Sequence, residues 1–158
     1  SKDELFAAVL DALSNELMAE LLEQGFDEAN PEDALKAFLS FIFEQYRSRP
    51  TLGALALEGM QFHKTHQTPR NRFLELAPAL TERLAGILPR GAISGQFRAG
   101  VDAGKFLAAV SLLMTGGFTN RYTVSAVAGF DPGAGEGLEE WRDFSIDLVR
   151  LALRPRCT

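Results

Sequence analysis

Apolar side chains recur at intervals of three and four residues through almost all of this 158-residue chain, and no stretch alternates strictly for long. That spacing puts them on one face of a helix, whereas a half-buried strand needs an interval of two. The pattern therefore predicts an all-α fold, a multi-helix bundle. A single domain of this length buries about two-thirds of its unfolded surface, so one hydrophobic core is expected.

Capping residues, prolines and glycines divide the chain into predicted helices. Ser1 and Glu4 form a capping box, Asn30 and Pro31 open the second helix, and Asp102 is a predicted cap further on. The second helix is apolar on most sides, so we expect it to lie inside the bundle. The predicted ranges are 2–24, 31–49, 51–63, 69–88, 103–117 and 138–153.

Composition and charge exclude several function classes. The net charge is −5, so the chain has no basic footprint for binding duplex DNA. The apolar run at 106–118 is too short to cross a bilayer, and a lone Cys157 excludes an internal disulfide framework. We therefore expect a cytoplasmic protein that does not enter membranes.

The residues that could carry metal or catalytic chemistry lack partners. His63 and His66 face the same way on a helix, but no Cys or obvious carboxylate completes a zinc site. Gly95 and Gly100 have phosphate-loop spacing, yet Val101 follows where Lys is needed. No Glu precedes a His by three residues, and no Gly-x-Ser-x-Gly elbow occurs. We expect no metal, no cofactor and no catalytic residue.

Three segments carry a family resemblance. The opening Ser-Lys-Asp-Glu-Leu-Phe-Ala-Ala-Val-Leu resembles the segment that joins the DNA-binding head to the ligand-binding body in the TetR family of bacterial transcriptional repressors. Residues 95–102 resemble the family's turn into its penultimate long helix, and 120–125 resemble a segment common in one branch. The resemblance implies that residues 1–158 are a ligand-binding and dimerisation domain without its helix-turn-helix head. Operator DNA would then be bound only through that absent head.

The same resemblance implies an apolar small-molecule effector inside each subunit, which releases DNA allosterically. The chain holds twelve phenylalanines, and several lie on helices that the family arranges around a cavity. Ligand pockets are mostly apolar with a few placed polar groups, so Asn120 or Tyr122 is the expected polar contact. The expected walls are Phe38, Phe41, Ile42, Met60, Phe73, Leu76, Leu80, Val110 and Met114.

A two-fold homodimer is expected from the last two long helices, because both carry more apolar surface than one neighbour can cover. The expected interface residues are Ala109, Leu112, Gly116, Trp141, Phe144, Leu148 and Leu151. Two alternatives remain. One is a helical homodimerisation or interaction module without a ligand, and the other is a small helical enzyme acting on an apolar substrate.

Overall fold

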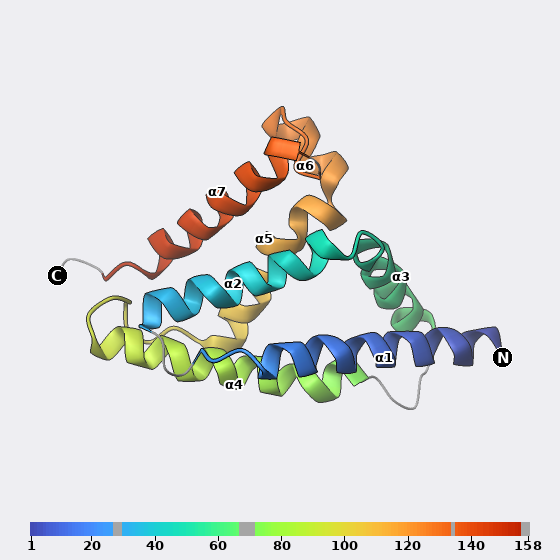
Figure 1. The fold of residues 1–158 in the computed structure, drawn as a ribbon, viewed down its shortest axis with the longest axis horizontal. Helices are drawn as coiled ribbons and strands as arrows, with labels where there is room; N and C mark the ends of the chain where they lie inside the picture. Colours follow the sequence, from blue (N-terminus) through green and yellow to red (C-terminus); the bar gives the residue numbers. More distant parts are fainter. Residues whose placement is uncertain (27–29, 67–71, 134, 156–158) are drawn as a thin grey trace.

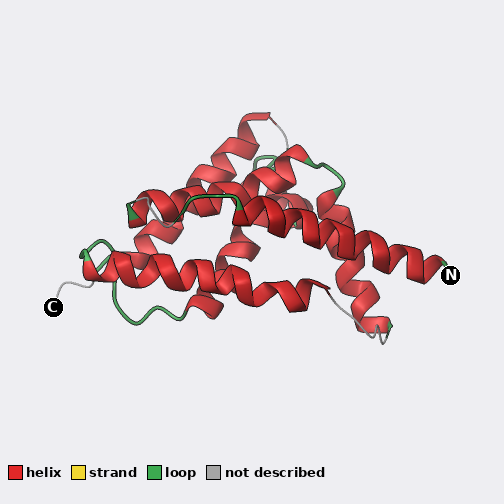
Figure 2. Ribbon diagram, turned by 60° about the horizontal axis from the view of Figure 1, so that its bottom comes forward, coloured by secondary structure: helices red, strands yellow, loops and turns green. Residues whose placement is uncertain are grey.

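The computed structural model describes residues 1–26, 30–66, 72–133 and 135–155; of Phe73 it describes only the backbone. Within these ranges the chain forms seven helices and no strand (Figures 1 and 2), which confirms the predicted all-α fold. Pro69, the predicted start of the fourth helix, and Cys157 lie outside them. The helices are α1 Lys2–Leu22, α2 Pro31–Ser48, α3 Leu52–Thr65, α4 Arg72–Ile93, α5 Ala103–Thr119, α6 Arg121–Ala128 and α7 Gly135–Leu153.

Helix α2 occupies the inside of the bundle, as its wide apolar arc predicts. It packs against α3, α4, α5 and α7. Its fully enclosed side chains are Ala34, Leu35, Phe38, Leu39 and Phe43. The helix begins as expected, because Asn30 accepts a hydrogen bond from the backbone N–H of Glu32 at 3.0 Å. The side-chain oxygen of Gln96, from the loop after α4, accepts from the same N–H at 3.1 Å.

Helix α1 lies against α4 along one edge of the molecule, and its first residues extend past α3 to the end of the molecule (Figure 1). The predicted capping box is confirmed: the Ser1 hydroxyl accepts from the backbone N–H of Glu4 at 3.2 Å, and the Glu4 carboxylate binds back to Ser1. Only Met18 and Leu21 of α1 are buried. The buried anchoring of α1 is therefore concentrated in its second half.

The structure corrects the predicted helices in two places. Helix α4 continues through Pro89 to Ile93, beyond its predicted end at residue 88, so Gly91 is helical. A Cβ at Gly91 would overlap the ring of Phe97, which makes this glycine a packing requirement. Gly95 and Gly100, which follow α4, both have the left-handed backbone conformation, at φ 74°.

The second correction concerns the region after α5, where α6 is a separate short helix that the periodicity did not predict. It ends at Gly129, in the left-handed conformation at φ 76°. None of its residues is buried.

No helix in the described ranges is both long and apolar enough to span a bilayer.

Candidate functional site

The predicted pocket residues on α2, α4 and α5 do come together. Phe38, Val110 and Met114 are buried in one core cluster, at 2% exposure or less. Phe41, Ile42, Leu76 and Leu80 are half-buried and pack against that cluster. These seven side chains converge because helices α4 and α5 both pack on α2, and α4 also packs on α5. The sequence spacing thus placed each set on the correct face of its helix.

Three other predicted residues lie elsewhere. Met60 on α3 is 55% exposed and Tyr122 on α6 is 87% exposed, so neither lines the interior in this structure. Asn120 is exposed at the junction of α5 and α6, where its amide donates to the Thr119 hydroxyl at 3.0 Å. The side chain of Phe73 lies outside the described residues.

The centre of the predicted pocket is closely packed, because Phe38, Val110 and Met114 are each at most 2% exposed. The two depressions described on the protein are open ones at the surface, away from the predicted walls. The first lies between the end of α1 and α4, at Leu22, Ala79, Glu82 and Arg83. The second is lined by Ala92, Gly95, Phe97, Arg98, Ala99 and Pro155. An effector in the core would therefore have to displace side chains.

One hydroxyl-bearing residue is fully buried and another is half-buried where the sequence indicated only apolar faces. Ser145 on α7 is fully buried. Its Oγ has no hydrogen-bond partner, and no other buried side-chain nitrogen or oxygen of the described residues lacks one. Tyr46 on α2 stacks at a tilt on Phe118, with ring centroids 5.7 Å apart, and burial raises the pKa of its hydroxyl. Sequence reasoning missed both because they occur within apolar helix faces. The sequence signal that could have indicated Ser145 is a serine among the apolar residues of one helix face.

The predicted dimer residues divide into an inner and an outer group. Trp141 and Gly116 join α5 to α7 within the subunit: a Cβ at Gly116 would lie 3.5 Å from Cζ2 of the indole. The other five face outward on α5 and α7, and we call them the α5–α7 outer face. They are Ala109, Leu112 (73% exposed), Phe144 (56%), Leu148 (45%) and Leu151 (52%). Exposed apolar residues on two helices that pack together, as α5 and α7 do, are typical of an interaction surface.

His63 and His66 lie near the end of α3. The His66 ring stacks on Phe62 at 4.4 Å between centroids, and its Nε2 lies 3.7 Å from Oδ2 of Asp3. No group of three metal-ligating side chains occurs within the described ranges.

Residues 31–149 match the family described as "Tetracyclin repressor-like, C-terminal domain". The match covers most of the chain and includes α2 to α6 and most of α7. The chain therefore belongs to the TetR family and is a C-terminal regulatory domain of its kind. Members of this family are transcription factors and not enzymes, which removes the helical-enzyme alternative.

A curated relative agrees with this assignment. The HTH-type transcriptional repressor NicS of Pseudomonas putida strain KT2440 is 26% identical to this chain over 159 residues. The alignment covers 98% of this chain and 73% of the relative. The similarity therefore extends over α1 as well, beyond the region matched by the family.

Proposed function

We propose that this chain is the effector-binding and dimerisation domain of a transcriptional repressor, acting in the cytoplasm. The observation that carries the proposal is the family match across residues 31–149. It is supported by the relative NicS, an HTH-type transcriptional repressor, of which about a quarter lies outside the alignment. We propose that operator DNA is bound by a helix-turn-helix head joined at the start of α1. The acidic balance of the chain, net charge −5, supports that division of roles.

We propose an apolar small molecule as the effector, bound among α2, α3, α4 and α5. Phe38, Val110 and Met114 would form the centre of its site. Since these side chains are closely packed without a ligand, binding requires a local opening. Helix α3 suits that role, because Gly53 and Gly59 are buried in it and lower its helix propensity.

We assign the polar contact to the effector to a hydroxyl beside these helices: Ser145 on α7, which packs on α2 and α5, or Tyr46 on α2. Ser145 has an unpartnered Oγ, and Tyr46 is half-buried beside Phe118. A ligand group that bonded Ser145 would remove the cost of an unmade hydrogen bond. Asn120 and Tyr122 would have to turn inward from exposed positions to serve instead.

Two subunits would associate through the α5–α7 outer face. This surface is apolar, and pairing of the surface with its own copy about a two-fold axis would give a closed homodimer. Effector and operator would then favour different arrangements of the two subunits, so that each weakens the binding of the other.

A dimerisation module that takes no ligand is the second candidate, and the closely packed centre is the observation that favours it. Thermal unfolding of the chain with a library of apolar compounds separates the two candidates. The sensor predicts that at least one compound raises the melting temperature. It also predicts that Ser145→Ala lowers the affinity for that compound by about tenfold, the equivalent of one lost hydrogen bond.

Ser48→Ala is the matched control, because the Ser48 hydroxyl is exposed and donates to the carbonyl oxygen of Glu44 at 2.6 Å. It should bind the compound as tightly as the parent. If no compound stabilises the chain while the dimer persists, the dimerisation module is the better account.

A further inference from the structure

Two arginines bracket helix α3 in the sequence, and both bind helix α1. Arg49 follows the last residue of α2 and precedes α3, whereas Arg72 is the first residue of α4, after α3. Each reaches a pair of α1 side chains spaced four residues apart, which lie on one face of that helix. The two ends of the α3 segment are therefore both tied to α1.

Arg49 forms the first tie. Its guanidinium makes an ion pair with Glu20 and a second with Glu16, the latter at 3.1 Å. The Gln45 side-chain oxygen accepts a further hydrogen bond from it. The Arg49 side chain is only 26% exposed, so these contacts are partly shielded from water.

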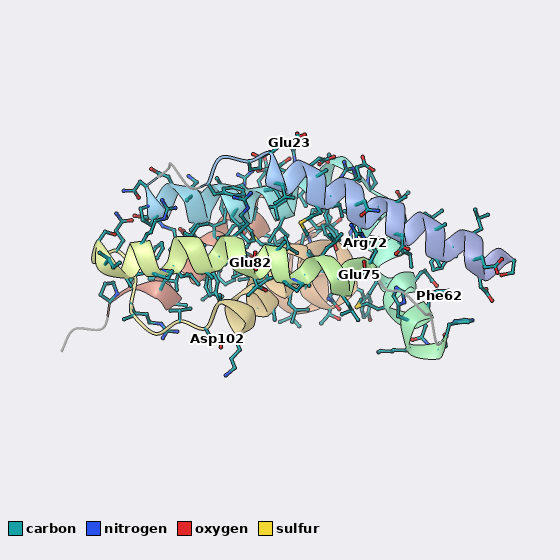
Figure 3. All side chains as sticks on the ribbon, turned by 90° about the horizontal axis from the view of Figure 1, so that it is seen from below. Glu23, Phe62, Arg72, Glu75, Glu82 and Asp102 are labelled. Carbon is teal, nitrogen blue, oxygen red and sulfur yellow. The ribbon has the colours of Figure 1, made fainter. Side chains whose placement is uncertain are left out.

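Arg72 forms the second tie, with both its backbone and its side chain. Its backbone N–H donates to Oδ1 of Asp11 at 3.2 Å, and its Nε donates to Oδ1 of Asn15 at 2.6 Å. A third donor, Nη1, binds the Glu75 carboxylate at 2.7 Å and steadies the guanidinium. Figure 3 shows Arg72 at the start of α4, beside α1. Asp11 also places a carboxylate at the first turn of α4, where the helix dipole favours negative charge.

The first part of α1, residues 2–10, lies beyond both ties and rests on α3. The Phe6 and Phe62 rings meet edge to face at 5.2 Å, and Asp3 approaches His66. A Cβ at Gly59 would lie only 3.1 Å from Cδ2 of Leu10. Figures 1 and 3 show this part of α1 running past α3 to the end of the molecule.

We propose that Arg49 and Arg72 are positioning residues that clamp residues 11–20 of α1 to the body. Residues 2–10 then form an arm whose direction is set by α3. A displacement of α3, which lies between the two arginines in the sequence, changes the support under the arm but leaves the clamped part in place. This inference rests on the proposed function, in which an effector moves α3 and a DNA-binding head continues from Ser1.

A larger side chain at the contact between α3 and the arm tests whether the arm and the clamped part of α1 move separately. Gly59→Leu adds bulk directly against Leu10, and Ala54→Leu adds the same bulk on an exposed side of α3 as the control. The only tryptophan, Trp141, serves as energy-transfer donor. The acceptor dye is attached through Leu5→Cys or Ala19→Cys in a Cys157→Ser background.

We expect Gly59→Leu to change energy transfer to position 5 while position 19 stays as in the parent, and Ala54→Leu to change neither. Equal shifts at both positions would mean that α1 moves as one rigid rod, and no shift at either would mean that α3 does not steer the arm. Both results overturn the proposal.

Hydrogen exchange tests the clamp itself. In the double variant Arg49→Gln, Arg72→Gln we expect amides within residues 11–20 to exchange about tenfold faster, because α1 can open locally once the ties are lost. Arg47→Gln is the control, since Arg47 pairs with Glu44 within α2. If the double variant unfolds, Asn15→Ala replaces it, because this change removes one acceptor of Arg72 and leaves both arginines in place. Amides within residues 11–20 should then exchange faster than in the parent, by a smaller factor. Unchanged exchange in both clamp variants would overturn the proposal.

These measurements need no effector. Their failure would remove the clamp and leave sensing intact, whereas a failed compound screen would remove sensing and leave the clamp.

Discussion

The indole Nε1 of Trp141 on α7 donates a hydrogen bond to the backbone carbonyl oxygen of Leu113 on α5, at 3.0 Å. A glycine makes the approach possible, because a Cβ at Gly117 would lie 3.0 Å from Cδ1 of the same indole. This contact fixes the rotation of α7 against α5. It thereby sets which side chains of the two helices face outward, including those of the proposed dimer surface.

Replacing Trp141 with Phe should lower the free energy of unfolding by about 1 kcal/mol from the lost hydrogen bond, with a further loss from reduced packing. Chemical denaturation followed by circular dichroism measures the change. Because α7 would lose its fixed rotation, the variant should also dimerise more weakly in sedimentation equilibrium. Unaltered values for both quantities would show that the contact does not orient the helix.

Leu148→Glu should give monomers or aggregates in sedimentation, because it places a charge within the α5–α7 outer face. Folding should be retained, since Leu148 is 45% exposed in the single subunit. Ile93→Glu is the control: Ile93 is 88% exposed at the end of α4, and its variant should associate like the parent. A stable Leu148→Glu dimer with native helicity would move the interface elsewhere.

Asp131 should give the segment around α6 a dependence on pH. The hydrogen bond from Arg121, together with that from the Gly133 backbone N–H, holds the pKa of Asp131 below its usual value. A lowered pKa in the folded state means that the carboxylate stabilises the fold above its unfolded pKa of about 3.8. That stabilisation is lost as the pH falls through the lower folded pKa.

The comparison that tests this effect is hydrogen exchange of the α6 amides in the parent and in Asp131→Asn. Slower exchange in the parent is expected at pH 6, and the difference should shrink as the pH drops below about 4. A difference that is the same at both pH values would rule out the charged form of Asp131 as its cause.

Ser145→Ala should raise the free energy of unfolding of the ligand-free chain, by on the order of 1 kcal/mol, because it removes a buried hydroxyl that has no partner. Urea denaturation of parent and variant measures the difference. If the variant is instead less stable by a comparable amount, the hydroxyl makes a hydrogen bond in the folded protein and is not available to an effector.

The helices that bury side chains were predictable, and the one that buries none was not. In α2 the spacing of Phe38, Leu39 and Phe43 gave both the helix and its inward face. Helix α6 has no buried residue, so it leaves no apolar stripe to read. It is braced instead by the Arg121–Asp131 ion pair, which joins residues ten positions apart and has no helical period.

The site was predictable to the extent that periodicity determines it. Phe38, Val110 and Met114 converge as expected, because each lies on the apolar face of a long helix. Met60 was misplaced because the inward face of α3 is marked by Gly53 and Gly59, and a glycine adds no apolar signal. Periodicity also predicts which side chains point inward, but it does not predict how much free space remains between them. The free space inside depends on how the helices pack together, and around Phe38, Val110 and Met114 they pack closely.

Native mass spectrometry of the purified chain, after incubation with apolar compounds that raise its melting temperature, tests the central claim most directly. An effector-binding and dimerisation domain predicts a dimer that carries one compound in each subunit, with lower occupancy in Ser145→Ala. A monomer, or a dimer whose mass none of the compounds changes, would contradict the account.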